Sequence, residues 1–200
     1  MMMNNILHEL KKLYPDPKCM LDYNKDYELV ISVMLSCRST DKTVNKVAKT
    51  LYKYKLNDIY NMDIDKLKNI IKPVGTQYKK ASNIKIISKK ILDKGYVPND
   101  RTFLESLPGI GRKCANVILS ELYNEDLIAV DTHVSRTSKR LGIAEETDSP
   151  LEIEKKLMKT FPKGEYSKLH LRLVTFGRNI CKAKNPLCNE CPFYPCKSKK

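Results

Sequence analysis

The sequence predicts an all-α protein, and three features support this class. Apolar residues recur at helical spacing along most of the 200-residue chain, as in the stripe from Ala81 to Ile91 that stops before Gly95. Residues that begin and end helices flank most of these stripes. The one apolar run that could be a buried strand, Leu29 to Leu35, has helical neighbours and no partner strand nearby. We therefore interpret that run as a buried helix.

Capping residues set the expected helix boundaries. One helix opens at Ser39, Thr40 or Asp41, which are all good N-caps, and another ends at Pro73 and Gly75. Ser149 followed by proline starts a later helix. Nine or ten helices are expected, at 29–35, 41–51, 65–72, 79–94, 100–106, 112–123, 131–142, 149–160 and 166–179, after an amphipathic stretch at 1–13 and with an extended connector at 127–130.

The charge of the chain indicates a polyanionic partner. The formal net charge is +14 and the pI is near 9.4. Basic domains of this kind commonly bind nucleic acid, because each phosphate contact releases a counterion. A lysine-rich composition without such a partner is the other explanation. The first 13 residues do not form a signal peptide, and no apolar run reaches the about 20 residues that a membrane span needs, so we expect an intracellular protein that does not enter a membrane.

The segment between the helices at 100–106 and 112–123 reads LPGIGRK. Gly109 and Gly111 allow a tight turn with outward-facing amides, and the following helix presents its first-turn amides, starting at Arg112, beside that turn. Such a hairpin can bind a DNA phosphate without reading the base sequence. An ordinary joint between two helices is the alternative, but the full string in so basic a chain favours DNA binding.

Two residues are candidates for catalysis. Lys113 lies in the first turn of its helix, where the helix dipole disfavours a cation, so its amine can serve as a nucleophile toward a deoxyribose carbon. Asp131 can hold a carboxylate near the sugar, to take a proton or to steady the positive charge that develops as the base departs. A solvated lysine and a simple N-cap are the structural alternatives. His133 is a candidate phosphate contact or an ordinary surface histidine.

Four of the seven cysteines lie close together near the C-terminus: Cys181, Cys188, Cys191 and Cys196. A structural zinc site usually pairs two Cys-x2-Cys knuckles across a long gap, and that pattern is missing. The compact x6, x2, x4 spacing favours an iron–sulfur cluster held by four thiolates over zinc. Nearby lysines, including Lys184, could face a phosphate backbone.

With these motifs, the chain resembles the endonuclease III family of DNA glycosylases. The hairpin string with Ala115–Val117, the Ala129–Val134 segment with Arg136, and Gly177-Arg178 with the four cysteines carry the resemblance. Leu35-Ser36, Thr40-Asp41 and Asn45-Lys46 extend it toward the N-terminus. It covers nearly the whole chain, in order.

The resemblance implies two helical lobes with DNA across the cleft: residues 19–127 as a six-helix barrel, and 1–18 with 128–200 as a lobe carrying a [4Fe–4S] cluster. Lys113 would form a Schiff base, and Asp131 would be its carboxylate partner. The substrates would be oxidised pyrimidines in double-stranded DNA, flipped out of the stack, with β-elimination at the abasic site. A monomer suffices for this chemistry, and a cytoplasmic, nucleoid-associated protein is expected.

Three positions depart from the family pattern. The last cysteine gap is x4 where relatives usually have x5. Arg38 stands where many relatives use glutamine to fill the space left by the flipped base, and arginine can do so by stacking and hydrogen bonding. Relatives place a bulky apolar residue, which acts as a wedge in the DNA, near the position of Thr76. In this chain Gln77 or Tyr78 could take that role.

Two rival interpretations remain open from the sequence. One is a relative that excises adenine or another mismatched base without lyase activity, a subclass that generally lacks a lysine at the position of Lys113. The other is a non-catalytic DNA-binding module with a zinc-stabilised tail.

Overall fold

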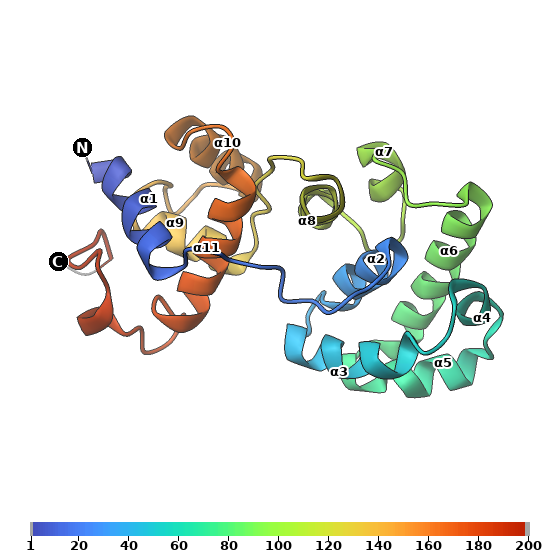
Figure 1. The fold of residues 1–200 in the computed structure, drawn as a ribbon. Coiled ribbons are helices and arrows are strands. Elements are labelled where there is room, and N and C mark those ends of the chain that lie inside the picture. Colours follow the sequence, from blue (N-terminus) through green and yellow to red (C-terminus); the bar gives the residue numbers. More distant parts are fainter. Residues whose placement is uncertain (1, 199–200) are drawn as a thin grey trace. The chain divides into compact units, whose positions relative to one another are not determined.

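A computed structural model of the chain describes residues 2–198, with side chains from residue 5 onward. The predicted all-α class is confirmed: these residues form eleven α-helices, two short 3-10 helices and no strand (Figure 1). No helix in this part of the chain is long and apolar enough to cross a membrane. The chain forms two compact units, residues 19–123 and residues 1–18 with 124–200. The division after Tyr123 precedes the predicted boundary at 127 by four residues, since the chain already leaves the first unit where its last helix ends.

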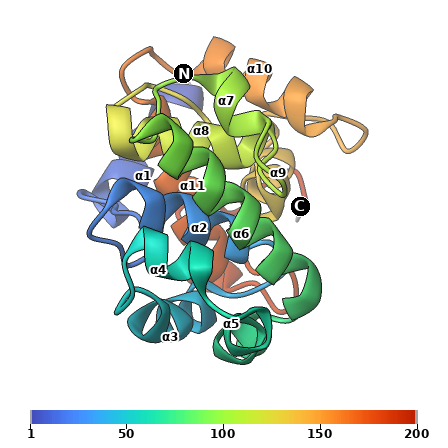
Figure 2. The same cartoon turned by 90° about the vertical axis from the view of Figure 1, so that its right-hand side faces the viewer.

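The central unit contains seven α-helices and one 3-10 helix. They are α2 (Asp26–Leu35), α3 (Asp41–Leu51), α4 (Leu56–Asn61), α5 (Ile64–Ile71), η1 (Lys72–Val74), α6 (Gln77–Lys94), α7 (Arg101–Glu105) and α8 (Arg112–Tyr123). Helix α2 packs against α3, α6 and α8, while α4 and α5 pack along α6 (Figure 2). Every residue from Leu29 to Leu35 is buried, so the apolar run is a core helix as predicted. Its buried Ser32 hydroxyl is hydrogen-bonded to the Tyr52 hydroxyl at 2.6 Å.

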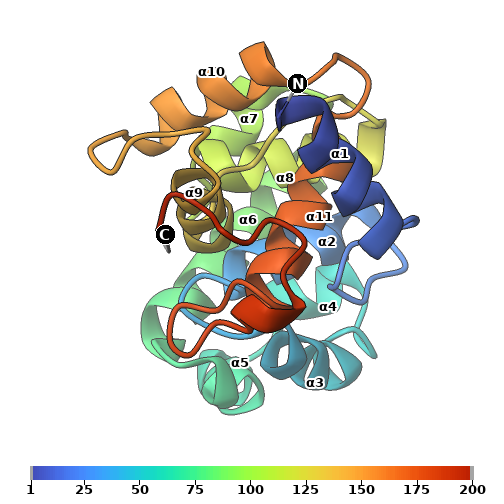
Figure 3. The same ribbon diagram turned by 90° about the vertical axis from the view of Figure 1, so that its left-hand side faces the viewer.

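The two ends of the chain together build the second unit. It contains α1 (Met2–Leu13), α9 (Thr132–Arg140), α10 (Pro150–Thr160), α11 (Tyr166–Asn179) and η2 (Cys188–Glu190). Helix α11 packs against both α1 and α9 (Figure 3). The buried Arg172 guanidinium donates to the carbonyls of Tyr14 and Pro15, and Lys11 forms an ion pair with Glu165 at 2.5 Å.

The structure differs from the sequence prediction in a few boundaries. Helix α4 is absent from the prediction because six residues with one fully buried side chain, Ile59, give no helical period to detect. Helix α6 begins at Gln77 rather than 79, directly after Thr76 in a left-handed conformation (φ 47°). Helix α9 ends at Arg140, and Gly142 adopts a positive φ of 75° just beyond it.

Candidate active site and cysteine loop

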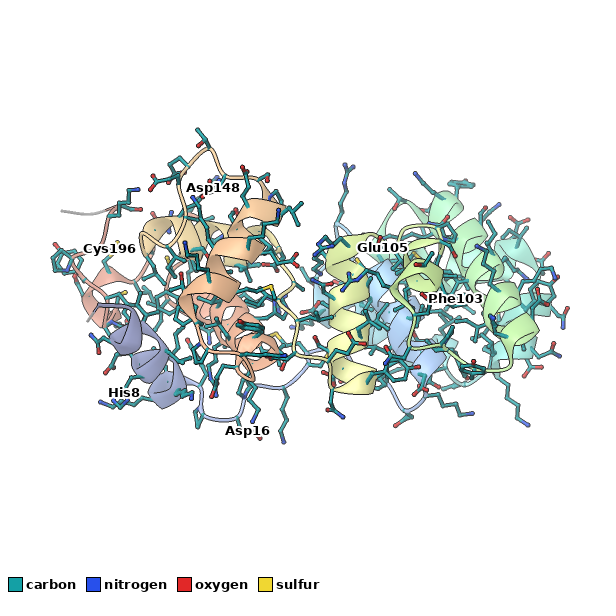
Figure 4. The ribbon with its side chains drawn as sticks, turned by 90° about the horizontal axis from the view of Figure 1, so that it is seen from above. His8, Asp16, Phe103, Glu105, Asp148 and Cys196 are labelled. Atoms are coloured by element: carbon teal, nitrogen blue, oxygen red, sulfur yellow. The ribbon has the colours of Figure 1, made fainter. Side chains whose placement is uncertain are left out.

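The predicted hairpin joins α7, which carries Phe103 and Glu105 (Figure 4), to α8. Leu107 and Ile110 are buried, and the Ile110 N–H donates to the Leu107 carbonyl at 3.1 Å to close the turn. Gly111 and Arg112 are exposed, so α8 begins at the surface. The apolar side chains of the hairpin anchor it in the core beneath this helix N-terminus.

Gly109 is required by the close packing of this turn. Its φ of 84° lies in the left-handed region, which glycine adopts without steric cost. A Cβ at this position would lie 3.0 Å from Nδ2 of Asn83 on α6 and 3.1 Å from Cγ of Met34 on α2. The hairpin thus rests directly on two helices of the central unit.

Lys113 follows the hairpin in the first turn of α8 and is half-buried. Three cysteine thiols, those of Cys19, Cys37 and Cys114, lie within electrostatic range of its amine. These three cysteines lie far apart in the sequence, so their spacing gives no signal that they lie near this lysine.

Lys80 is a second lysine of interest in the central unit, and the sequence analysis did not single it out. Its side chain is buried, and its Nζ donates to the carbonyls of Leu35, Cys37 and Val74 at 2.9, 2.9 and 2.8 Å. These carbonyls belong to the end of α2, to the turn that follows it and to η1. Lys80 therefore ties together the two turns that carry the wedge candidates Arg38 and Thr76.

The wedge candidates themselves lie on strained turns. Arg38 and Thr76 are both exposed and both adopt positive φ values, 57° and 47°. A positive φ is uncommon for residues with a side chain. Tyr78, on the first turn of α6, is 68% exposed, and its ring lies 4.8 Å from the Lys68 ammonium.

Asp131 belongs to the second unit, where it caps α9. One carboxylate oxygen, Oδ1, accepts hydrogen bonds from the backbone amides of His133 and Val134, both at 2.8 Å. The side chain is half-buried, and this pairing fixes its orientation at the helix N-terminus. The predicted N-cap is thus present, and both of these hydrogen bonds use the same carboxylate oxygen.

His133 is half-buried beside Asp131. Burial lowers the pKa of its imidazole, the Asp131 carboxylate opposes that shift, and the guanidinium groups of Arg136 and Arg178 add to it. The Arg136 Nη2 lies 3.2 Å from His133 Nδ1. A guanidinium only donates, so this contact is a hydrogen bond when the ring is neutral and its Nδ1 carries no proton.

Two arginines one turn apart on α9 bind the start of the cysteine loop. Arg136 donates to the carbonyls of Gly177 and Cys181 at 2.7 and 3.0 Å. Arg140 donates to the Lys182 carbonyl at 2.7 Å and lies 3.5 Å from the Cys181 sulfur. The aspartate-bearing helix and the cysteine loop therefore form one continuous structure.

The four C-terminal cysteines line a single cavity of about 200 Å³, and Cys196 is labelled in Figure 4. Ile180, Pro186 and Leu187 supply much of its wall. Burial, with a smaller effect of the neighbouring cysteine thiols, raises the pKa of Cys191. Within residues 2–198, no three cysteine, histidine or acidic side chains converge closely enough to hold a single metal ion. The thiols surround a space rather than a point.

The other predicted DNA contact, Lys184, is exposed on this cysteine loop. Lys199 and Lys200, two further lysines near this loop in the sequence, lie outside the described residues. Of the predicted residues, Arg38, Gly109, Gly111, Arg112 and Lys113 lie on the central unit, and Asp131, His133, Lys184 and the four cysteines lie on the other.

Residues 31–163 match the HhH-GPD superfamily of base excision DNA repair proteins. Endonuclease III of Bacillus subtilis (strain 168) is 46% identical over 191 residues, which are 94% of this chain and 87% of that protein. The chain belongs to the endonuclease III family. Endonuclease III of Buchnera aphidicola subsp. Acyrthosiphon pisum (strain APS) is 42% identical over a match that covers 94% of this chain and 91% of that protein.

Solved structures agree with this membership. A trapped endonuclease III–DNA covalent intermediate superposes with a TM-score of 0.92 at 42% identity, covering 98% of this chain and 95% of that one. A non-covalent endonuclease III–DNA complex gives the same TM-score at 44% identity, covering 96% and 91%. The predicted resemblance is confirmed, and the predicted enzyme class of the endonuclease III family, a bifunctional DNA glycosylase and abasic-site lyase, follows from it.

Proposed function

We propose that this endonuclease III family member removes oxidised pyrimidines from double-stranded DNA through a Schiff base on Lys113. The neutral amine attacks C1′ of the flipped nucleotide, the C1′–N bond to the base breaks, and the resulting imine allows β-elimination of the 3′ phosphate. Asp131 takes the proton of the attacking amine or steadies the positive charge on the sugar. The single observation that carries this proposal is Lys113 at the first turn of α8, directly after the GIGR hairpin.

The hairpin and its neighbours supply the proposed DNA contacts. The exposed residues Gly109, Gly111 and Arg112 bring the N-terminus of α8 to the surface, and a helix N-terminus favours the negative charge of a phosphate. Arg38, exposed on its left-handed turn, suits the space left by the flipped base. His133 and Lys184 extend the proposed contact along the backbone of the DNA. The endonuclease III relatives solved with DNA support DNA as the partner.

The four C-terminal thiols fit an iron–sulfur cluster, because all four line one cavity with apolar residues in its wall. The endonuclease III family is known to carry a [4Fe–4S] cluster. We infer that Cys181, Cys188, Cys191 and Cys196 hold it, and that it folds the tail and orients the basic loop.

Borohydride trapping tests the nucleophile. The purified protein is incubated with a duplex containing thymine glycol or an abasic site, and borohydride reduces any imine to a stable amine. We expect a covalent protein–DNA complex with the native chain and with Lys159→Ala, an exposed lysine on α10, but none with Lys113→Ala. If Lys113→Ala gives as much covalent complex as the native chain, Lys113 is not the nucleophile. If the native chain leaves the thymine glycol base in place and the DNA strand intact, the proposed substrate class is wrong.

Asp131→Asn separates charge from capping. An asparagine Oδ1 can still accept the two amide hydrogen bonds of the α9 cap, so the fold should persist while the negative charge is lost. We expect DNA binding to remain and turnover to fall by about 10²-fold or more. Asp63→Asn is the matched control, because Asp63 caps α5 with the same two-amide pattern. Normal turnover in Asp131→Asn would refute the proposed role.

Metal analysis tests the cysteine loop and the rival module. We expect brown protein with about four irons and four acid-labile sulfides per chain, lost in Cys188→Ser. One tightly bound zinc without iron would support the zinc-stabilised module instead. We further propose that the protein acts as a monomer on chromosomal DNA inside the cell, which sedimentation with and without a short duplex would check.

A further inference from the structure

Two cysteines outside the C-terminal loop meet beside the hairpin. Cys37 lies in the turn after α2, and Cys114 lies in the first turn of α8. Their thiols are in hydrogen-bonding contact. The Cys37 sulfur also lies 3.8 Å from the Gly109 carbonyl oxygen, which confirms that the turn and the hairpin are in contact.

The two thiols differ in exposure and in chemistry. Cys37 is exposed, whereas Cys114 is 6% exposed. The hydrogen bond from Cys114 lowers the pKa of the Cys37 thiol, burial opposes the shift, and the nearby Lys113 and Lys80 ammonium groups add to it. The same hydrogen bond, together with burial, raises the pKa of Cys114. The exposed Cys37 thiol is therefore the more acidic of the two, and it lies against a buried, less acidic thiol.

This arrangement resembles in its chemistry an attacking thiolate paired with a resolving thiol. The thiolate form reacts with peroxides, and an adjacent thiol can then capture the product before it is oxidised further. The Lys80 ammonium donates to the Cys37 carbonyl at 2.9 Å, which ties this turn to α6, and the left-handed Arg38 follows directly.

We propose that Cys37 and Cys114 form a peroxide-sensitive dithiol that closes reversibly to a disulfide next to Lys113. In the first step the Cys37 thiolate attacks hydrogen peroxide, the O–O bond breaks, and the products are a Cys37 sulfenic acid and hydroxide. In the second step the Cys114 sulfur displaces water from that sulfenic acid. The two thiols lose two electrons in total, and peroxide takes them up. A thiol reductant reverses the reaction.

The disulfide would join the Arg38 turn covalently to the helix that carries Lys113. This consequence depends on the role proposed for Lys113 above. A tie at Cys114 restricts how far the neighbouring amine and the Arg38 turn can adjust to a flipped nucleotide, so oxidation should slow Schiff-base formation.

Peptide mapping tests the disulfide without reference to activity. The reduced holoprotein is treated with hydrogen peroxide, quenched, alkylated under denaturing conditions and digested with trypsin. We expect peptides 26–38 and 114–136 to be found cross-linked, with two hydrogens fewer than their sum, and to separate after reduction. Cys37→Ser and Cys114→Ser should abolish the cross-link, and Cys19→Ser should retain it. Stable sulfinic acid on Cys37 with no cross-link, in folded protein, would overturn the proposal.

Alkylation rates supply a second measurement that needs no oxidant. At pH 7 we expect iodoacetamide to modify Cys37 at least about tenfold faster than Cys19, since burial raises the pKa of Cys19 to about 11. Cys114→Ala should reduce the Cys37 rate, and equal rates for Cys37 and Cys19 would contradict the proposal. Borohydride trapping of oxidised and of re-reduced protein then tests the effect on Lys113. If the cross-link forms but the yield of trapped protein–DNA complex is unchanged, the proposed effect on Schiff-base formation is refuted, while the proposed dithiol is still supported.

Discussion

Replacing Lys80 by methionine should destabilise the central unit. Methionine keeps an unbranched apolar side chain but removes the ammonium that accounts for three hydrogen bonds, to the carbonyls of Leu35, Cys37 and Val74. Two of those contacts are buried. Because a helix ends with carbonyls that have no intrahelical donor, the substitution removes the side-chain donor of the Leu35 carbonyl at the C-terminus of α2.

The expected loss follows from these contacts. Hydrogen bonds to a charged group contribute about 1.5–3 kcal/mol each, so three could amount to more than about 5 kcal/mol. Removing a buried charge also relieves its desolvation cost, and water can reach the carbonyl of the exposed Cys37. We therefore expect the free energy of unfolding to fall by about 3 kcal/mol.

Urea denaturation followed by circular dichroism measures this difference. Lys79→Met is the matched control, because Lys79 is the adjacent residue on α6 and is exposed. The control should change the unfolding free energy by less than about 0.5 kcal/mol. If Lys80→Met lowers the free energy of unfolding by less than about 1 kcal/mol, the three carbonyl contacts are weak in solution and do not stabilise the central unit as expected.

Three further predictions concern the second unit. Gly177→Ala should cost about 1–3 kcal/mol in chemical denaturation, because its Cβ would lie 3.1 Å from the His133 Cβ and push α11 from α9; an unchanged midpoint would contradict this close approach. The Lys11 ammonium, followed by Arg172, lowers the pKa of Glu165, so its stabilisation is present above the ordinary value of 4.5 and is lost as the pH falls through the lowered value. Lys11→Met should therefore flatten the acid limb of a stability–pH curve, and an identical limb would count against the pair. Lys184→Ala should weaken binding to any duplex and reduce the slope of log K against log salt by about 1, and an unchanged slope would exclude a phosphate contact.

The sequence predicted the helices with long periods and clear caps, and it predicted the hairpin and its lysine. Helices α8, α10 and α11 have the predicted bounds because each combines a long apolar stripe with a marked start or end. Family resemblance singled out Asp131, and the structure adds the hydrogen bonds by which it caps α9.

Contacts between distant segments could not be predicted in this way. Lys80 is one of many lysines, and only folding places its ammonium against three carbonyls from two other turns. The contact between Cys37 and Cys114 likewise joins positions 77 residues apart. Arg140 gives a weak signal, since it follows Arg136 by one helical turn, but its target on the cysteine loop depends on tertiary structure.

The order of synthesis matters for a unit assembled from both ends of the chain. Helix α1 leaves the ribosome well before its partner α11, which is made more than 150 residues later, and the Lys11–Glu165 pair spans 154 residues. Until then the apolar side chains of Ile6 and Leu10 have no α11 to cover them. The intervening residues 19–123 contain a complete core and can fold while translation continues. A ribosome stalled before Tyr166 would therefore hold a finished central unit with an exposed, aggregation-prone leading helix, a substrate for chaperones.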